Sequence, residues 1–254
     1  MGVNISTIQL GGCSGCHVSI LDIGKELFRG EINIVHSYLL MDKVTATIEA
    51  ESDILIIEGA ILTNRDEKLI KLMAPHAKKV VAVGSCACFG GIACLGNLGT
   101  PFRPQKEDFD EPGHKLHPLI CSPKAFINVD YFIPGCPPPA DVIRDVLFAL
   151  IEGKPVPEFA HTVCDECDRE RKGEPPPIPP GGKWKTLLDK APDSRKCFLE
   201  QGYLCLGRQT IGGCKASCIK ANMPCEGCRG PIFLFRGFKK FTDEEKGEIL
   251  RCLK

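Results

Sequence analysis

Sixteen cysteines among 254 residues dominate the chemistry that this sequence can support. Three pairs have only two residues between their members: Cys13 and Cys16, Cys164 and Cys167, and Cys225 and Cys228. Thiols at this spacing either form disulfides, which need an oxidising compartment, or bind a metal centre together. We expect metal binding in a cytoplasmic protein, because no export signal precedes the first apolar segment.

One group of four cysteines follows strand-like apolar segments. Cys13 and Cys16 come after Ile5–Leu10, Cys86 after Val80–Val83, and Cys136 after Phe126–Ile133. In a parallel sheet the loops after the strands meet at one edge, where ligands bind. The flanking glycines let backbone amides approach a bound group. The four thiolates therefore predict one [4Fe–4S] cluster.

Three neighbours of this group have alternative interpretations. Cys88 competes with Cys86 as a ligand, and we prefer Cys86 because it lies nearer the strand end. His17 completes a Cys-x-x-Cys-His pattern typical of haem attachment, but without export we expect an ordinary polar residue in a helical turn. Glu58 ends another strand at the same edge, where it either tunes the cluster, caps a helix or has an ordinary loop role.

The segments that must position these residues alternate between strands and helices. Further strands are expected at Ile32–Tyr38 and Ile54–Glu58. A capping box of Asn64 and Glu67 predicts one helix, and apolar residues at helical spacing predict another that ends before Gly153. The fold class is therefore α/β, with a doubly wound parallel sheet covered on both faces.

The composition changes beyond residue 155, and we expect domains at residues 1–155 and 156–254. Eight cysteines lie between Cys164 and Cys228, with little apolar periodicity, and Glu174–Gly182 is rich in proline. Such an irregular domain needs bound metal for stability, and its eight cysteines divide into two sets of four. Two zinc sites would use the same thiolates. Cys88, Cys94, Cys121 and Cys252 are left as free thiols.

The charge and hydropathy of the chain exclude two classes of partner. The formal net charge is zero, so nothing indicates a nucleic acid. No apolar run reaches the roughly 20 residues of a membrane span.

Three motifs, residues 11–16, 84–91 and 134–138, resemble the cluster loops of [NiFe] hydrogenase small subunits. Residues 200–207, Cys214 and 224–228 resemble the cytosolic methyl-viologen-reducing type, which in methanogenesis works with heterodisulfide reductase. The resemblance implies a flavodoxin-like first domain and three [4Fe–4S] clusters. The implied ligands are Cys13, Cys16, Cys86 and Cys136 for the proximal cluster, Cys214, Cys218, Cys225 and Cys228 for the medial cluster, and Cys164, Cys167, Cys197 and Cys205 for the distal cluster.

The resemblance also implies partners and a role. Electrons from hydrogen oxidation on a [NiFe] large subunit would pass through this chain, itself not catalytic, to an iron–sulfur or flavin subunit of a heterodisulfide reductase-type complex. Periplasmic relatives have a histidine in place of Cys164 and often a proline in place of Cys218. All-thiolate ligation implies lower potentials. The alternatives are a cluster wire fed by formate dehydrogenase or a deazaflavin-reducing module, and a zinc-binding scaffold without redox function.

Overall fold

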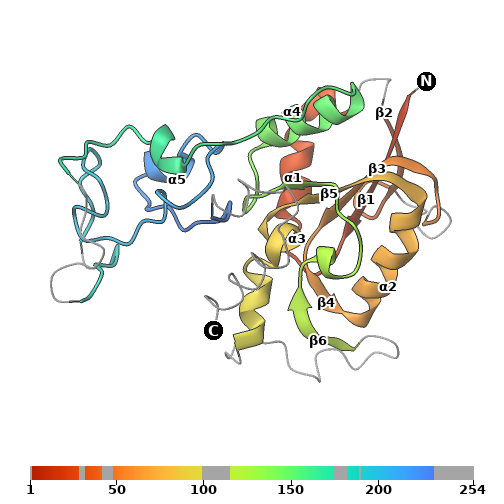
Figure 1. Cartoon of the computed structure of the whole chain (residues 1–254), viewed down its shortest axis with the longest axis horizontal. Coiled ribbons are helices and arrows are strands. Elements are labelled where there is room, and N and C mark those ends of the chain that lie inside the picture. The colour runs from red at the N-terminus through yellow and green to blue at the C-terminus, as the bar shows by residue number, and fades with distance from the viewer. Residues whose placement is uncertain are drawn as a thin grey trace, which may run out of the picture. The chain divides into compact units, whose positions relative to one another are not determined.

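The computed structural model describes residues 2–28, 32–41, 48–98, 115–173, 182–188 and 190–231. Its contacts divide the chain into two compact units, Met1–Pro157 and Glu158–Lys254. Cys252 and most of the proline-rich stretch lie outside the described residues. Each unit is described by itself below, and Figure 1 labels helices α1–α5 and strands β1–β6.

The first unit is built on a five-stranded parallel sheet (Figure 1). The strand order is β2-β1-β3-β5-β7. Their bounds are β1 Val3–Gln9, β2 Ile32–Ser37, β3 Ser52–Glu58, β5 Ala77–Val83 and β7 Tyr131–Ile133. This is the flavodoxin-like order, which puts a ligand crevice where the connections change direction. The predicted α/β class is therefore confirmed.

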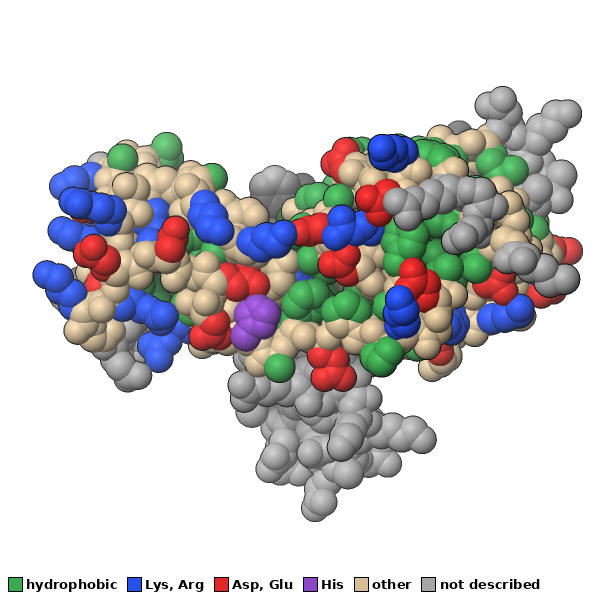
Figure 2. All heavy atoms as spheres, turned by 90° about the horizontal axis from the view of Figure 1, so that it is seen from above, with side chains coloured by type: hydrophobic (Ala, Val, Ile, Leu, Met, Phe, Trp, Pro, Cys, Tyr) green, Lys and Arg blue, Asp and Glu red, His purple; other side chains and the backbone are tan. Residues whose placement is uncertain are grey.

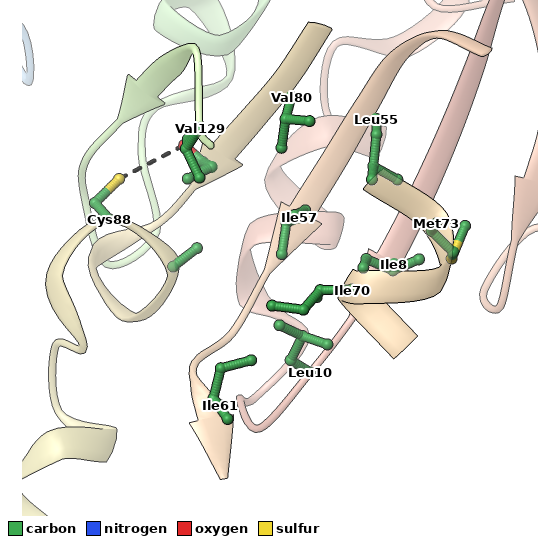
Figure 3. Close-up of a cluster of buried hydrophobic side chains, with 12 residues drawn as sticks. Ile8, Leu10, Leu55, Ile57, Ile61, Ile70, Met73, Val80, Cys88 and Val129 are labelled. Atoms are coloured by element: carbon green, nitrogen blue, oxygen red, sulfur yellow. Dashed lines mark hydrogen bonds between the residues drawn. The ribbon is translucent and has the colours of Figure 1, made fainter. Parts of the chain in front are cut away.

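Helices cover both faces of this sheet. Their bounds are α1 Gly15–Leu21, α2 Asn64–Met73, α3 Ser85–Phe89 and α4 Ala140–Ile151. Ile57 of β3 packs with Ile70 of α2 and with Ala87 of α3, in the core shown in Figure 3. The opposite face carries Ile56, which lies beside Ile20 of α1. Since β3 is buried on both faces, its apolar run is continuous, as in the sequence.

Two sequence-based boundaries were wrong. The strand predicted at Phe126–Ile133 is ordered only over Tyr131–Ile133, because a short 3-10 helix and a turn occupy the residues before it. Helix α2 is capped one residue earlier than predicted, by Thr63 and Asp66, which exchange backbone hydrogen bonds. The missed signal was a threonine three residues before an acidic residue.

The sequence reading also missed several short elements. Strands β4 (Ile61–Thr63) and β6 (Leu116–Cys121) form an antiparallel pair beside the main sheet. The 3-10 helices are η1 Gly24–Glu26, η3 Ala74–His76, η4 Ala93–Leu98, η6 Pro123–Ala125 and η7 Val163–Glu166. Of these five, η7 belongs to the second unit.

The described part of the second unit is irregular, as predicted. Its regular elements are η7 and the short helix α5, Ser217–Lys220. A small buried cluster holds it together: Val163, Phe198, Tyr203, Ala216, Ile219 and Cys225. No helix in the described ranges has the length and apolar character required to cross a membrane.

The core of the first unit makes one stability prediction. Ile57 is fully buried in β3, so Ile57→Ala should leave a cavity and lower the free energy of unfolding by about 2–5 kcal/mol. Leu72 on α2 is 39% exposed, and Leu72→Ala is the matched control with a much smaller expected cost. Anaerobic chemical denaturation followed by circular dichroism measures both. Equal losses in the two variants would contradict the described core.

Candidate metal centres

The four predicted proximal cysteines lie together at the carboxyl edge of the sheet. Cys13 follows β1, Cys16 lies in the first turn of α1, and Cys86 is the second residue of α3. Burial raises the pKa of the Cys16 thiol well above its ordinary value. The Glu58 carboxylate and the thiols of Cys86, Cys13 and Cys136 raise that pKa further, because each is close enough to repel a thiolate.

Backbone hydrogen bonds fix the loops that carry these thiols. The Ser85 N–H donates to the Gly135 carbonyl at 2.7 Å, which joins the Cys86 loop to the Cys136 loop. The Ser19 hydroxyl on α1 donates to the Pro138 carbonyl. The set is therefore held by the fold of the first unit.

Glu58 takes the capping role that the sequence left open. From the end of β3, its carboxylate accepts the N–H of His17 at 2.9 Å and that of Cys16 at 3.3 Å. The His17 ring Nδ1 also contacts this carboxylate, and both side chains are buried. An acidic group at the first turn of α1 satisfies free amides there and holds Cys16 in place. Both the backbone N–H and the ring Nδ1 of His17 therefore contact Glu58.

The structure separates Cys86 from Cys88. Cys88 lies in the apolar core of Figure 3, and its thiol donates to the Ala82 carbonyl at 3.5 Å. Cys86 lies on the side of α3 that meets Cys16.

Burial raises the pKa of the Cys94 thiol, which donates to the Ile120 carbonyl at 2.9 Å.

The four predicted distal cysteines line one pocket in the second unit. Its lining residues are Cys164, Cys167, Arg169, Arg171, Cys197, Phe198, Leu199, Cys205, Arg208 and Ile219. Burial raises the pKa of the Cys164 thiol to about 11, against a lowering effect of Arg171. The thiols of Cys205, Cys167 and Cys197 add to the rise, so all four interact. A Cβ on Gly207 would lie 3.3 Å from the Cys164 Sγ.

The four predicted medial cysteines are joined less directly. Burial raises the pKa of Cys225 to about 11, and the neighbouring Cys205 and Cys228 thiols contribute to that rise. Cys214 lies near Arg229, which follows Cys228 in the chain and lowers the Cys214 pKa against a larger effect of burial. Cys218 is exposed on α5.

Two contacts connect the medial and distal sets. The Cys225 N–H donates to the Cys205 Sγ at 3.3 Å. Glu166, between Cys164 and Cys167, accepts the N–H groups of Gly213 and Ala216 on either side of Cys214. Burial favours the neutral form of Glu166, but hydrogen bonds from His161, Gly213 and Ala216 outweigh it and lower its pKa. Glu166 is therefore a charged brace between the two cysteine loops.

The donor chemistry fits iron–sulfur clusters. None of the fifteen described cysteines forms a disulfide, and the proximal and distal sets each bring four thiols together. Gly84 has φ +90°, and a Cβ there would overlap the Cys16 Sγ, so the backbone approaches the thiols closely. Within the described ranges, no three His, Cys, Asp or Glu side chains lie close enough to hold a single metal ion.

Comparison with known proteins identifies the family. Residues 13–150 match the family described as NADH ubiquinone oxidoreductase, 20 Kd subunit. The chain is 37% identical to a subunit of the F420-non-reducing (vhu) hydrogenase of Methanocaldococcus jannaschii, over 91% of this chain and 82% of that one. The chain belongs to the family of [NiFe] hydrogenase small subunits. It is an electron-transfer subunit of the F420-non-reducing type.

Other hydrogenase chains extend this likeness. The iron–sulfur subunit of the F420-non-reducing hydrogenase of Archaeoglobus profundus is 29% identical, over 98% of this chain and 89% of that one. A chain of the Dm. baculatum [NiFeSe]-hydrogenase has the same fold, with a TM-score of 0.62 at 21% identity, covering 96% of this chain and 97% of that one. The predicted family and hydrogenase membership are thus confirmed.

Sequence reasoning missed three residues of the second unit that serve the cysteine loops. Glu166, Arg169 and Arg229 are all partly or fully buried, although charged residues usually lie at the surface. Each lies within two residues of a predicted ligand, and that proximity was the available signal. The hydrogen bonds that give these residues their roles join distant segments and cannot be inferred from spacing.

Gly84 provides a test of the proximal site. An alanine methyl group would displace the Cys16 Sγ, so we expect Gly84→Ala to lose about four irons per chain. Gly153 also has positive φ (+67°), but a methyl group added there would meet nothing within 4 Å, so Gly153→Ala should cost only about 1–2 kcal/mol and keep its iron. Iron analysis of both purified variants is the measurement. Full iron in Gly84→Ala would show that Cys16 is not a ligand.

Proposed function

We propose that this subunit conducts electrons from hydrogen oxidation through three [4Fe–4S] clusters. Cys13, Cys16, Cys86 and Cys136 hold the proximal cluster; Cys214, Cys218, Cys225 and Cys228 hold the medial cluster; and Cys164, Cys167, Cys197 and Cys205 hold the distal cluster. The observation that carries the proposal is the gathering of complete four-thiol sets around Cys16 and around Cys164.

The protein supplies ligands, orientation and electrostatics, while the clusters supply one-electron chemistry. Glu58 accepts hydrogen bonds from the N-terminal turn of α1 and thereby fixes the position of Cys16. Glu166 fixes the loop around Cys214, and the Cys225 N–H reaches the Cys205 sulfur. That last contact supports a short path between the medial and distal sets. Hydrogen activation itself is assigned to another chain.

The proposed partners follow from the order of the sets. A [NiFe] large subunit faces the proximal cysteines, of which Cys13 and Cys136 are exposed. An iron–sulfur or flavin subunit of a heterodisulfide reductase-type complex receives electrons near Cys164–Cys205. We place this complex in the cytoplasm, where a chain whose fifteen described cysteines form no disulfide stays reduced. Mass identification of the proteins that co-purify with the chain tests both partners.

Metal analysis tests the cofactor directly. The anaerobically purified complex should contain about twelve irons and about twelve acid-labile sulfides in this chain. Two zinc ions without sulfide would instead support a zinc-binding scaffold and would falsify the proposed electron transfer through clusters. The co-purified proteins could instead include a formate dehydrogenase or a deazaflavin-reducing module and no [NiFe] large subunit. That result would support the alternative in which this module, and not hydrogen oxidation, supplies the electrons.

Cys136→Ser should disconnect the chain from its electron donor. The first unit keeps its core, so we expect normal far-ultraviolet circular dichroism together with loss of hydrogen-dependent dye reduction by the complex. Cys88→Ala is the matched control, because Cys88 is a buried core residue near Cys86 and should leave dye reduction intact. Unchanged dye reduction in Cys136→Ser would refute this ligand assignment.

Cys225→Ser should unfold part of the second unit. Cys225 belongs to its small buried cluster and is also a proposed ligand, so its loss removes packing and metal binding together. Limited proteolysis of the purified complex should cleave beyond Pro157 faster than in the unaltered protein. Met223→Ala, at a residue that is 44% exposed, is the control and should be cleaved at the normal rate. Equal protection in both variants would contradict metal-dependent folding of this unit.

A further inference from the structure

Arg169 is a buried cation beside the distal cysteine set. It lies two residues after Cys167 and is only 6% exposed. Its guanidinium group lies 3.9 Å from the centre of the Phe198 ring. Nη1 donates to the carbonyls of Asp193 (2.7 Å) and Lys196 (2.9 Å), and Nη2 donates to the Ile219 carbonyl (3.3 Å) and the Asn222 Oδ1 (2.6 Å).

These contacts leave two requirements of Arg169 unmet. All four acceptors are neutral, so none of them balances the positive charge. In addition, the buried Nε–H has no hydrogen-bond partner among the described residues. A buried charge and a buried donor are both costly unless an anion and an acceptor lie nearby.

The pocket beside Arg169 is where such an anion would bind. Arg169 lines it together with all four distal cysteines. A [4Fe–4S] cluster with four thiolate ligands is negatively charged, and its sulfurs accept hydrogen bonds. The pocket therefore offers a ligand with the charge and the acceptor atoms that Arg169 lacks.

We propose that Arg169 is the buried counter-ion of the distal cluster and that its Nε–H donates to a sulfur of that cluster. The inference rests on the proposed function of Cys164, Cys167, Cys197 and Cys205. When the cluster accepts one electron, no bond forms and no proton moves, and the arginine stays protonated. The cation stabilises the more negative reduced form more strongly, so it raises the reduction potential.

Other basic residues provide matched controls. Lys and Arg side chains are numerous on the second unit, as the blue side chains of Figure 2 show. Arg171 lines the same pocket but is exposed, so water and salt screen its charge. Arg195 is exposed and does not line the pocket. A specific role predicts that Arg169 affects the potential much more than Arg171, and that Arg195 has no effect.

The experiment is a redox titration of the intact complex followed by electron paramagnetic resonance and iron analysis. The distal signal is the one that Cys164→Ser alters. Arg169→Gln should shift the reduction equilibrium at least tenfold toward the oxidised cluster, which is about 59 mV for one electron. Arg169→Lys keeps the charge and should shift it much less. Arg195→Gln should leave the potential unchanged.

Each outcome decides the proposal. An unmoved potential in Arg169→Gln, or equal shifts in the Gln and Lys variants, overturns it. Arg169→Gln could also lose the distal cluster. In that case, retention of the cluster in Arg169→Lys supports a role for the charge of Arg169. Loss of the cluster in both variants shows that Arg169 only joins backbone segments and overturns the inference. Fewer than three clusters in the unaltered complex overturns the proposed function as well, and iron analysis identifies that case separately.

Discussion

The gathering of several thiols in partly buried positions, where burial and neighbouring thiols both oppose ionisation, is the constraint on which the rest of this structure depends. The Cys16 thiol is buried and the Cys164 thiol is partly buried, and each lies among other thiols, so its ionisation is unfavourable. The two units hold such groups in different ways. The first uses a sheet with apolar cores on both faces, so its cysteines are placed by a fold that other residues stabilise. The second has a small core and uses the buried Arg169 and the partly buried Glu166.

Much of the first unit could be predicted because its signals are local. The continuous apolar run at Ile54–Glu58 indicated a strand buried on both faces, and the structure contains that strand. The strand expected at Phe126–Ile133 was too long, since apolar residues in a turn resemble apolar residues in a strand. Periodicity cannot distinguish the two when a segment is short.

Cys86 and Cys88 show what helical geometry adds to sequence spacing. Residues two apart on a helix point to different sides, so only one of these thiols can face the other cysteines. The sequence favoured Cys86 by its distance from a strand, and the structure places the Cys88 thiol in the core. The hydrogen-bond partners of His17 and Arg169 come from segments far along the chain, and no local pattern indicates them.

The hydrogen bond from the Cys225 N–H to the Cys205 sulfur links the folding of one cysteine loop of the second unit to that of another. With Glu166 joining the Cys164 loop to the Cys214 loop, each cysteine set supports the backbone of the other. The two sets therefore form one cooperative element. Damage to one of them, for example by oxidation, therefore removes support from its neighbour, and the part of the second unit around both sets is lost together.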